Sequence, residues 1–298
     1  MSTVANRPRT VPELFAATGR LITEEGMRRA LAFRPRPTDI LIAPFAKSGT
    51  TWVQQIVHGL RTRGSMDFSE ITEVIPWIEI AHDMGIDLER PQPAEPRAYK
   101  SHLAWDLIPK GARYIYVIRD PRDVAVSTYH FFSGWWFEAG TISLDEITRA
   151  WLLGAEGPRR YWPHVVSWWE HRDDENVLFL CYENMKRDLP RTVRRIADFI
   201  GIPLDDELRD LVVRQSSIDF MRAHERRFDD HLIQETRNAA CGLPPGGESS
   251  KVRTGRSGDH ERELSPERIA EIDQVWKDEV GARIGFRSYA ELRDSIPG

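Results

Sequence analysis

A strand that breaks into a short polar turn and then enters a helix is the feature that most constrains how this chain can fold. The run from Asp39 to Phe45 is mostly apolar, which is typical of a buried parallel strand, and apolar residues recur at helical spacing from Trp52 to Leu60. The turn between them, Lys47 to Thr51, therefore lies at a helix N-terminus, where free backbone N–H groups and the helix dipole favour an anion. The sequence predicts an α/β fold with an anion site at this turn.

The residue types in this turn suit an anion, although they do not form a Walker A loop. Gly49 lets the backbone approach a ligand closely, Lys47 adds a full positive charge, and Thr50 and Thr51 add hydroxyl donors. In a Walker A loop the lysine follows the last glycine, whereas here Lys47 precedes Gly49. Taken alone, the segment is also compatible with an ordinary capped helix that carries an exposed lysine.

Strand-like runs alternate with helical patterns along the chain, which is typical of a mostly parallel sheet covered by helices on both faces. The expected strands are Asp39 to Phe45, Ala98 to His102, Tyr114 to Ile118 and Val177 to Cys181. The expected helices are Thr51 to Thr62, Pro121 to Phe132, Leu189 to Ile200, Asp205 to Arg214 and one that follows Ser265 as its N-cap. We expect a single α/β domain over residues 1–298 with a three-layer, P-loop-like fold. Residues 227–258, rich in Gly, Pro and charge, are expected to form a lid without regular structure.

Composition excludes several classes of function. The net charge of −5 opposes a general binder of nucleic acid or of anionic membranes, so an anion site has to be built locally from a few cations. The two cysteines, Cys181 and Cys241, give no disulfide framework and no metal-ligand spacing. No apolar run approaches the ~18 residues of a membrane span, and the first residues lack the apolar core of a signal peptide. The sequence favours a cytoplasmic protein.

Polar clusters follow each expected strand, and ligands collect at the carboxyl ends of such strands. Lys47 follows the first strand, Lys100 to His102 closes the second, Arg119 follows the third, and Tyr182 follows the fourth. We expect these clusters to converge. The guanidinium of Arg119 offers a planar fork that matches phosphate oxygens, and its alternative role is a surface salt bridge with a neighbouring aspartate.

Three segments resemble, in order and spacing, the signatures of cytosolic-type sulfotransferases: KSGTTW from Lys47, YVIRDPRDVAVSTYHFF from Tyr116, and VRTGRSGDHERELS from Val252. The pieces YKSHL and VLFLCYENMK also resemble family segments, and the resemblance extends from about Asp39 to Gly285. Enzymes of this family use 3′-phosphoadenosine 5′-phosphosulfate (PAPS) as sulfuryl donor and release 3′-phosphoadenosine 5′-phosphate (PAP). The resemblance therefore implies sulfuryl transfer to a hydroxyl group or to an amine.

The resemblance also implies which residues hold the nucleotide. Those for the 5′-phosphosulfate and the adenine are Lys47, Ser48, Gly49, Thr50, Thr51, Trp52, Tyr182, Ser216, Ile218 and Met221. Those for the 3′-phosphate are Arg119, Ser127, Arg253, Thr254 and Gly255. Four positions depart from the family pattern: Ala46 replaces a proline, Ile218 a phenylalanine, Thr254 a lysine and His260 a tryptophan. The change at Thr254 removes one cation and is expected to weaken nucleotide binding.

His102 is the general base that the resemblance implies, and a histidine of near-neutral pKa at a strand end suits removal of a proton from the acceptor. Its alternative role is that of a hydrogen-bonded structural histidine, while His130 is interpreted as a packing residue. Lys100 is expected beside the sulfuryl oxygens and Lys47 beside the bridging oxygen, with Ser127 completing the catalytic set. No metal is expected, because these cations and the helix-terminal amides take the role that magnesium has in phosphoryl transfer.

The acceptor site is expected to be apolar and aromatic. Its expected residues are Trp77, Ile78, His102, Trp135 and Phe137, and residues 1–38 are expected to contribute to the same side. Several of these aromatic side chains are also compatible with plain core packing. The expected partner is a small hydrophobic alcohol or phenol. The oligomeric state stays open, because residues 261–271 match the family's dimer segment poorly.

Two other classes of function remain compatible with the sequence. A P-loop-type kinase would share the fold, but it needs Walker A order and a magnesium-binding acid, for which Asp120 is the candidate. A non-catalytic PAP- or PAPS-binding protein would need neither His102 nor Lys100. The presence of these two residues therefore favours a catalytic protein over one that only binds the nucleotide.

Overall fold

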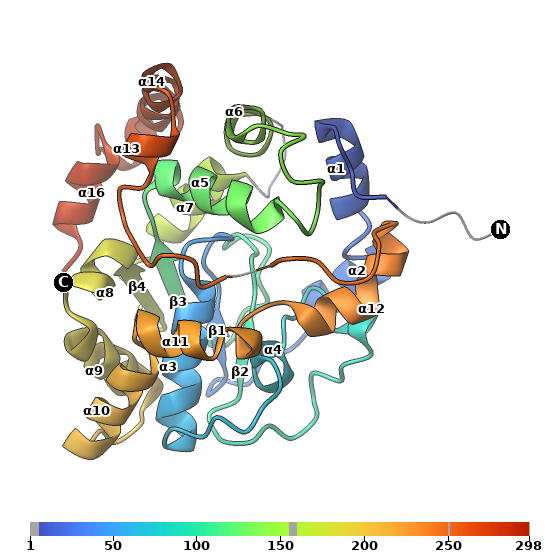
Figure 1. Ribbon diagram of the computed structural model, residues 1–298. Helices are drawn as coiled ribbons and strands as arrows, with labels where there is room; N and C mark the ends of the chain where they lie inside the picture. The colour runs from blue at the N-terminus through green and yellow to red at the C-terminus, as the bar shows by residue number, and fades with distance from the viewer. Residues whose placement is uncertain (1–5, 155–159, 250, 298) are drawn as a thin grey trace.

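The computed structural model describes residues 6–154, 160–249 and 251–297, and its centre is a four-stranded sheet (Figure 1). The strands are β1 (Ile40–Ile42), β2 (Ala98–Lys100), β3 (Arg113–Ile118) and β4 (Val177–Cys181). All neighbouring strands pair in parallel, in the spatial order β2-β1-β3-β4. The order reverses between β1 and β3, so the carboxyl ends of these two strands flank the crevice in which such sheets bind ligands.

Alternate side chains of each strand pack against helices on opposite faces, which gives three layers. On one face, Ile40 and Ile42 share an apolar cluster with α3 (Thr50–Thr62), α9 (Leu189–Ile200) and α10 (Asp206–Gln215). The opposite face is covered by α5 (Pro121–Phe132), α7 (Tyr161–Trp169), α14 (Pro266–Val275) and α16 (Tyr289–Ser295). Figure 1 shows both helical layers around the sheet.

The remaining helices of the described residues lie around this core. They are α1 (Val11–Thr18), α2 (Glu24–Ala32), α4 (Ile71–Val74), η1 (His82–Met84), α6 (Leu144–Ile147), η2 (Thr148–Leu153), α8 (Tyr182–Arg187), α11 (Ile218–Ala223), η3 (Glu225–Arg227), α12 (His231–Cys241), α13 (His260–Glu263), η4 (Trp276–Gly281) and α15 (Ala282–Ile284). A third apolar cluster joins α1 to the segment after α5, where Trp135 and Trp136 are buried.

The sheet and its helices confirm the predicted α/β fold, with small differences at the boundaries. The first strand ends at Ile42 rather than at Phe45, because the chain turns at Pro44, which has no backbone N–H to pair. The helix after it begins at Thr50, and Gly49 precedes it at a φ of 98°, a left-handed conformation that glycine adopts without steric cost.

The segment 227–258 contains the helix α12, so the expectation that it lacks regular structure is wrong for this part. The inward face of α12 is largely polar: Gln234 and Asn238 are buried. The side chain of Asn238 accepts a hydrogen bond from Trp135 Nε1 at 2.9 Å and donates one to the carbonyl of Pro244 at 2.9 Å. Since polar side chains occupy this face, the sequence carries no apolar stripe that would reveal the helix.

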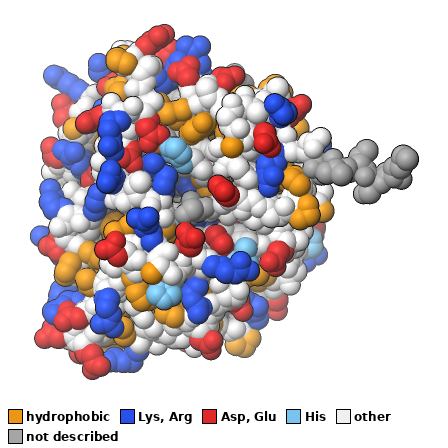
Figure 2. Space-filling model, viewed as in Figure 1, with side chains coloured by type: hydrophobic (Ala, Val, Ile, Leu, Met, Phe, Trp, Pro, Cys, Tyr) orange, Lys and Arg blue, Asp and Glu red, His pale blue; other side chains and the backbone are white. Residues whose placement is uncertain are grey.

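Charged side chains of both signs are interspersed over the face seen in Figure 2, which agrees with the small net charge of −5. The electrostatic character of a binding site must therefore come from particular residues rather than from the surface as a whole. No helix in the described part of the chain is both long and apolar enough to cross a bilayer.

Candidate active site

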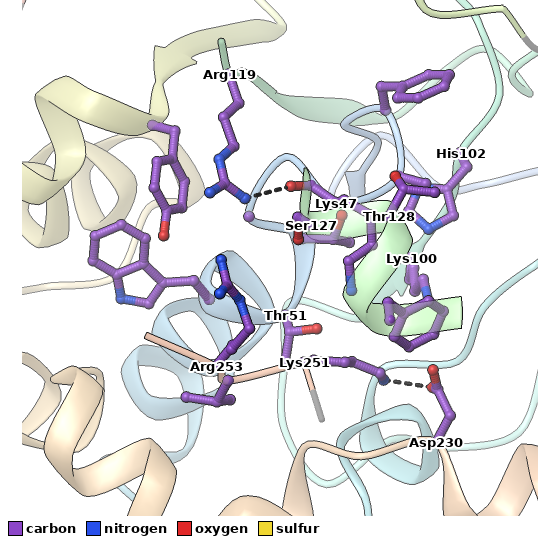
Figure 3. A pocket seen from close by; sticks show the side chains of 18 of the residues that line it. Lys47, Thr51, Lys100, His102, Arg119, Ser127, Thr128, Asp230, Lys251 and Arg253 are labelled. Atoms are coloured by element: carbon purple, nitrogen blue, oxygen red, sulfur yellow. Dashed lines mark hydrogen bonds and ion pairs between the residues drawn. The ribbon is translucent and has the colours of Figure 1, made fainter. Parts of the chain in front are cut away.

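A cavity of about 470 Å³ opens at the carboxyl ends of the strands, where the sequence predicts the ligand site (Figure 3). Lys47 follows β1, Lys100 ends β2, Arg119 follows β3, and Tyr182 begins α8 directly after β4. All four line the cavity, so the predicted convergence of the strand-end clusters is confirmed. The parallel sheet brings together residues that are far apart in the sequence.

The turn between β1 and α3 is held in a strained, open shape. Lys47 has a φ of 68°, a left-handed conformation that is uncommon for a residue with a side chain. At Gly49 a Cβ atom would lie 2.9 Å from the ring of Tyr182, so only glycine lets the chain pass this ring. The carbonyl of Lys47 accepts a hydrogen bond from Arg119 at 2.9 Å, which ties the turn to the end of β3.

Several donors around this turn have no protein partner. The hydroxyl groups of Ser48 and Thr50 are buried and make no hydrogen bond to any described residue, and the same is true of Arg119 Nε. Buried polar atoms without partners are rare in folded proteins and call for a ligand. Together with the N-terminus of the 13-residue helix α3, these donors fit a phosphate-like anion.

A second group of cations lies further along the cavity. Arg119 places its guanidinium 4.4 Å above the ring of Tyr182, and Ser127 on α5 and Arg253 also line this region (Figure 3). Arg253 is paired with Asp259 at 2.6 Å, so its charge is partly balanced. The alternative role of Arg119 as a surface salt bridge is not observed.

Residues 251–260, which we call the nucleotide strap, are fastened to α5. His260 Nδ1 lies 2.7 Å from Asp123 Oδ1, and the backbone N–H of Gly258 donates to Asp123 Oδ2 at 2.8 Å. Burial lowers the pKa of His260, but the hydrogen bond to Asp123 and the negative charges of Asp120 and Asp123 together outweigh it, so the pKa is raised overall. The histidine that replaces the family's tryptophan thus makes a polar contact that holds the strap.

The residues expected around an adenine form one end of the cavity. Trp52, Tyr182, Ser216, Ile218 and Met221 all line it. The indole N–H of Trp52 donates to the carbonyl of Ser216 at 2.8 Å, and its ring meets Tyr182 edge to face at 5.4 Å. Ile218 is 37% exposed and faces Gly255, where a Cβ atom would clash with it at 2.9 Å. These contacts fix a flat aromatic surface that suits a base.

His102 lies at the inner end of the cavity with one ring nitrogen already engaged. Its Nδ1 lies 2.8 Å from the carbonyl oxygen of Pro44, which only accepts, so Nδ1 carries the hydrogen and Nε2 keeps its lone pair. Burial, reinforced by the positive charge of Lys100, holds the pKa of His102 well below its usual value. The imidazole is therefore neutral at pH 7 and able to accept a proton.

Lys47 and Lys100 rest on aromatic rings rather than on carboxylates. Lys47 Nζ lies 3.7 Å from the centre of Phe131 and Lys100 Nζ lies 4.0 Å from that of Trp77. Burial lowers the pKa of Lys47 well below its usual value and that of Lys100 to about 8. Both ammonium groups gain from an anion that enters the cavity.

The acceptor side is lined by aromatic and aliphatic side chains from distant segments. They are Thr18, Leu21, Ile22, Met27, Phe45, Trp77, Leu103, Phe131, Phe132, Trp135, Trp136 and Trp151. The ring of Trp77 meets that of His102 edge to face at 5.2 Å, which places this wall next to the candidate base. Residues from the 1–38 extension lie on it.

Two expected acceptor residues do not line the cavity, and this part of the prediction is corrected. Ile78 is 1% exposed and packs in the core. Trp77 forms a single bridge with Lys100 and the chain turns directly after it, so Ile78 packs in the core while Trp77 lines the cavity. Phe137 is fully buried, and Trp136 takes the place on the wall. Ser48, which was expected in the nucleotide site, is fully buried and does not line the cavity either.

The sequence suggested that His130 is a packing residue, but its ring makes a polar contact instead. Its Nε2 lies 2.5 Å from Glu263 Oε2, and the side chain is 34% exposed. This hydrogen bond explains the position of the histidine, which does not line the cavity.

Sequence reasoning missed five charged residues that line the cavity: Glu79, Lys186, Asp230, Lys251 and Arg256. Glu79 lies in the turn that follows Trp77, where no periodicity of the sequence assigns it to a side. Its Oε1 accepts from the backbone N–H of His102 at 2.7 Å, and its Oε2 has no partner among the described residues. Asp230 and Lys251 meet only in the folded chain, and no sequence signal would have found that pair.

Comparison with known proteins supplies a family. The chain matches the sulfotransferase domain family over residues 37–283. It is 32% identical over 269 residues to sulfotransferase 1B1 of Canis lupus familiaris, covering 86% of this chain and 88% of that protein. It is 29% identical over 258 residues to an amine sulfotransferase of Oryctolagus cuniculus, covering 83% of this chain and 82% of that protein.

Solved structures share the fold at lower sequence identity. A structure of retinol dehydratase in complex with androsterone and inactive cofactor PAP superposes with a TM-score of 0.69 at 21% identity, covering 92% of this chain and 95% of that chain. A structure of mouse sulfotransferase SULT7A1 complexed with PAP superposes with a TM-score of 0.66 at 23% identity, covering 87% of this chain and 89% of that chain.

Proposed function

Because the chain belongs to the sulfotransferase domain family, we propose that it transfers a sulfuryl group from PAPS to a hydroxyl group of a small, mostly apolar acceptor. One observation carries the proposal. The cavity joins two separate sets of anion ligands to an aromatic chamber, and His102 lies where the two parts meet. A donor with two phosphate positions and an apolar acceptor would fill such a cavity.

The residues present fit PAPS. The unpartnered hydroxyl of Thr50, the helix N-terminus and Lys47 would hold the 5′-phosphosulfate. Arg119, Ser127 and the strap residues Arg253, Thr254 and Gly255 would hold the 3′-phosphate. That the two structural neighbours contain PAP supports this choice of nucleotide.

PAPS would supply a sulfuryl group whose bond to the phosphate oxygen breaks as a bond to the acceptor oxygen forms. His102 Nε2 would take the proton from that acceptor oxygen, since Nδ1 is fixed by Pro44. Lys100 would stabilise the charge on the sulfuryl oxygens, and Lys47 the charge that grows on the leaving phosphate oxygen. Both ammonium groups are already desolvated, which strengthens their effect.

The acceptor belongs to a class defined by the chamber: one polar group to be sulfated on a largely apolar body. One structural neighbour is in complex with androsterone, and one relative is named an amine sulfotransferase. The acceptors to be tested therefore range from steroid alcohols to amines. The cytoplasmic location and the oligomeric state stay predictions.

The alternatives differ in what they require. A P-loop kinase would use magnesium and a carboxylate ligand, but Asp120 is taken by Arg122 at 2.6 Å and does not line the cavity. A non-catalytic binder would not need an oriented, neutral histidine beside the acceptor wall.

The test is transfer of radiolabelled sulfate from PAPS to a panel of phenols, alcohols, steroids and amines, with and without EDTA. We expect PAPS-dependent product that does not depend on magnesium, with apolar hydroxyl compounds as the best acceptors. Transfer of a phosphoryl group from ATP to an acceptor, dependent on magnesium, would indicate the kinase instead. Tight PAP binding without turnover of any acceptor would favour the binding protein.

A further inference from the structure

Three buried lysines face the cavity, and they divide into two kinds. Lys47 and Lys100 rest on aromatic rings, and neither ammonium group makes an ion pair within residues 6–154, 160–249 and 251–297. Lys251 is different, because its Nζ lies 2.5 Å from Asp230 Oδ1 and 3.4 Å from Glu70 Oε1 (Figure 3). The three side chains of this cluster are only 7%, 5% and 0% exposed. Two buried carboxylates are thus satisfied by one lysine.

We propose that Lys251 is a positioning residue that neutralises Asp230 and Glu70 and thereby keeps the ammonium group of Lys100 available for the sulfuryl oxygens. The inference rests on the proposed function, because it concerns the reaction that Lys100 serves. Lys251 itself touches neither the base nor the donor in this scheme. It acts through Lys100.

The position of the cluster supports this role. Its members come from three separate segments: Glu70 precedes α4, Asp230 precedes α12, and Lys251 begins the nucleotide strap. All of them act electrostatically on Lys100: Lys251 repels its charged form, and Asp230 and Glu70 attract it. Lys251 lies outside the three sequence signatures, so the nucleotide site alone does not account for it.

Removal of Lys251 would leave two buried carboxyl groups without their cation, which is costly for a carboxylate that stays ionised unless another cation takes its place. Lys100 is the cation on which both carboxylates already act, and a lysine ammonium on a flexible stem can reorient. Drawn toward the carboxylates, it would leave the face of Trp77 and the place where the sulfuryl group binds. Burial raises the pKa of Glu70 to about 7 although Lys251 opposes the rise, so this carboxyl is only partly ionised at neutral pH.

Other charged groups near Lys100 do not fill the same role. The charged and titratable groups that face it are Lys47, Glu70, Glu79, His102, Asp230 and Lys251. Glu79 is engaged by the backbone N–H of His102, and Lys47 and His102 carry no negative charge. Only the pair Asp230 and Glu70 is both close to Lys100 and balanced by a third side chain.

The experiment compares Lys251→Met, Lys251→Arg and the triple variant Lys251→Met/Asp230→Asn/Glu70→Gln, with Lys277→Met on the exposed side of η4 as the matched control. For Lys251→Met we expect a loss in kcat on the order of 10²-fold, the size seen when one preorganised charge contact is lost, with little change in PAP affinity. Lys251→Arg keeps the charge and should recover most of the activity. The triple variant removes all three charges and should recover kcat to within about tenfold of wild type, because effects within one network do not add.

A second readout does not depend on turnover. The pKa of Lys100, followed by NMR of ¹³C-labelled lysine, is about 8 in the wild-type protein and should rise in Lys251→Met, because the released carboxylates favour the charged ammonium group. The alkaline limb of the pH profile should move upward in step. Loss of the repulsion from Lys251 alone also raises this pKa, so the triple variant is the reference. If Lys100 has the same pKa in Lys251→Met as in the triple variant, the released carboxylates do not act on it and the inference is overturned.

The outcomes separate the inference from the proposed function. An inactive wild-type protein whose Lys100 still responds to Lys251→Met would reject the sulfotransferase proposal and leave the electrostatic link in place. An active wild-type protein whose triple variant is no better than Lys251→Met would show that Lys251 is only a structural tie, which rejects the inference. Should Lys251→Met fail to fold, Lys251→Arg and the triple variant decide whether Lys251 is a positioning residue or only a structural tie.

Discussion

The donor half and the acceptor half of the cavity are built in different ways. In the proposed donor half, one contiguous run from Lys47 to Trp52 supplies a turn, a helix N-terminus and an aromatic ring, and only the proposed 3′-phosphate ligands such as Arg119 and Arg253 come from distant segments. In the acceptor half, the wall collects single side chains from α1, from Trp77, from the end of α5 and from Trp151. The donor half binds through backbone geometry and charge, and the acceptor half through shape. A change in either half should therefore be visible in a different measurement.

The largest effect is expected at His102, where the two halves meet. His102→Ala should lower turnover on the order of 10²- to 10⁴-fold, the usual contribution of a positioned general base. PAP affinity should hardly change, because the nucleotide is held by the donor half. The measurement is kcat together with calorimetric binding of PAP. His130→Ala, which removes a surface hydrogen bond, is the control, and near wild-type turnover in His102→Ala would contradict the assignment.

A comparison of two nucleotides isolates the donor half. PAP at 100 times its dissociation constant should stabilise the protein by roughly 2.7 kcal/mol. Adenosine 5′-monophosphate, which lacks the 3′-phosphate, should stabilise it much less, as measured by thermal unfolding without metal. Arg119→Gln should abolish most of the difference between the two nucleotides.

Arg122→Gln is the matched control for that comparison, because its guanidinium pairs with Asp120 outside the cavity. Equal shifts with both nucleotides in the wild-type protein would remove Arg119 and Arg253 from the 3′-phosphate site.

The geometry of the turn can be tested with two glycines. Gly49→Ala and Gly85→Ala both place a side chain at positive φ, which costs on the order of 1 kcal/mol of stability each. Only at Gly49 would the new Cβ also meet Tyr182, whereas at Gly85 nothing lies within 4 Å. Gly49→Ala alone should weaken PAP binding, by about tenfold if the added clash costs about 1.4 kcal/mol. Unchanged binding in Gly49→Ala would show that the turn has room to adjust.

The pH dependence tests the electrostatics at the boundary. The base must be neutral, and since the pKa of His102 lies well below 6.5, the acid limb of kcat/KM should lie below pH 6.5. Lys100 must be charged, and its pKa of about 8 should give a fall in kcat/KM above that pH. Lys100→Arg, which stays charged, should change the position of the alkaline limb, and a limb that remains belongs to Lys47, whose pKa is also lowered. An acid limb at or above pH 6.5 would contradict the neutral state of His102.

The smallest effect is expected behind the acceptor wall. Ile78→Val should cost about 0.5–1.5 kcal/mol of stability, because it leaves a small cavity in the core, and should not change the acceptor KM. Trp77→Phe, one residue away, should change the KM, since Trp77 faces the acceptor. A changed acceptor KM in Ile78→Val would mean that the core packing behind Trp77 also shapes the acceptor chamber.

The same contrast explains what the sequence could and could not predict. The strand-turn-helix from Asp39 onward and the convergence at the strand ends follow from local periodicity and from the rule for parallel sheets. Trp77, Ile78 and Phe137 are all apolar, and only the packing of the folded chain decides that Trp77 lines the cavity while the other two are buried in the core. The ion pair of Lys251 with Asp230 depends on long-range packing, and α12 was hidden by its polar inner face.

The late position of the nucleotide strap has a consequence for how the protein is made. The sheet is complete at Cys181, but the strap is synthesised only afterwards, and Tyr289 of α16 hydrogen-bonds to Glu183, which also accepts from the backbone N–H of Asp120. Domains tend to form from the N-terminus as the chain leaves the ribosome, so the turn at Lys47 emerges with its buried donors uncovered. Nucleotide present during synthesis would lack the ligands that we propose in the strap, Arg253, Thr254 and Gly255, until late in synthesis. We therefore expect PAP to protect the finished protein against proteolysis, and to give no such protection to ribosome-bound chains that end before Arg253.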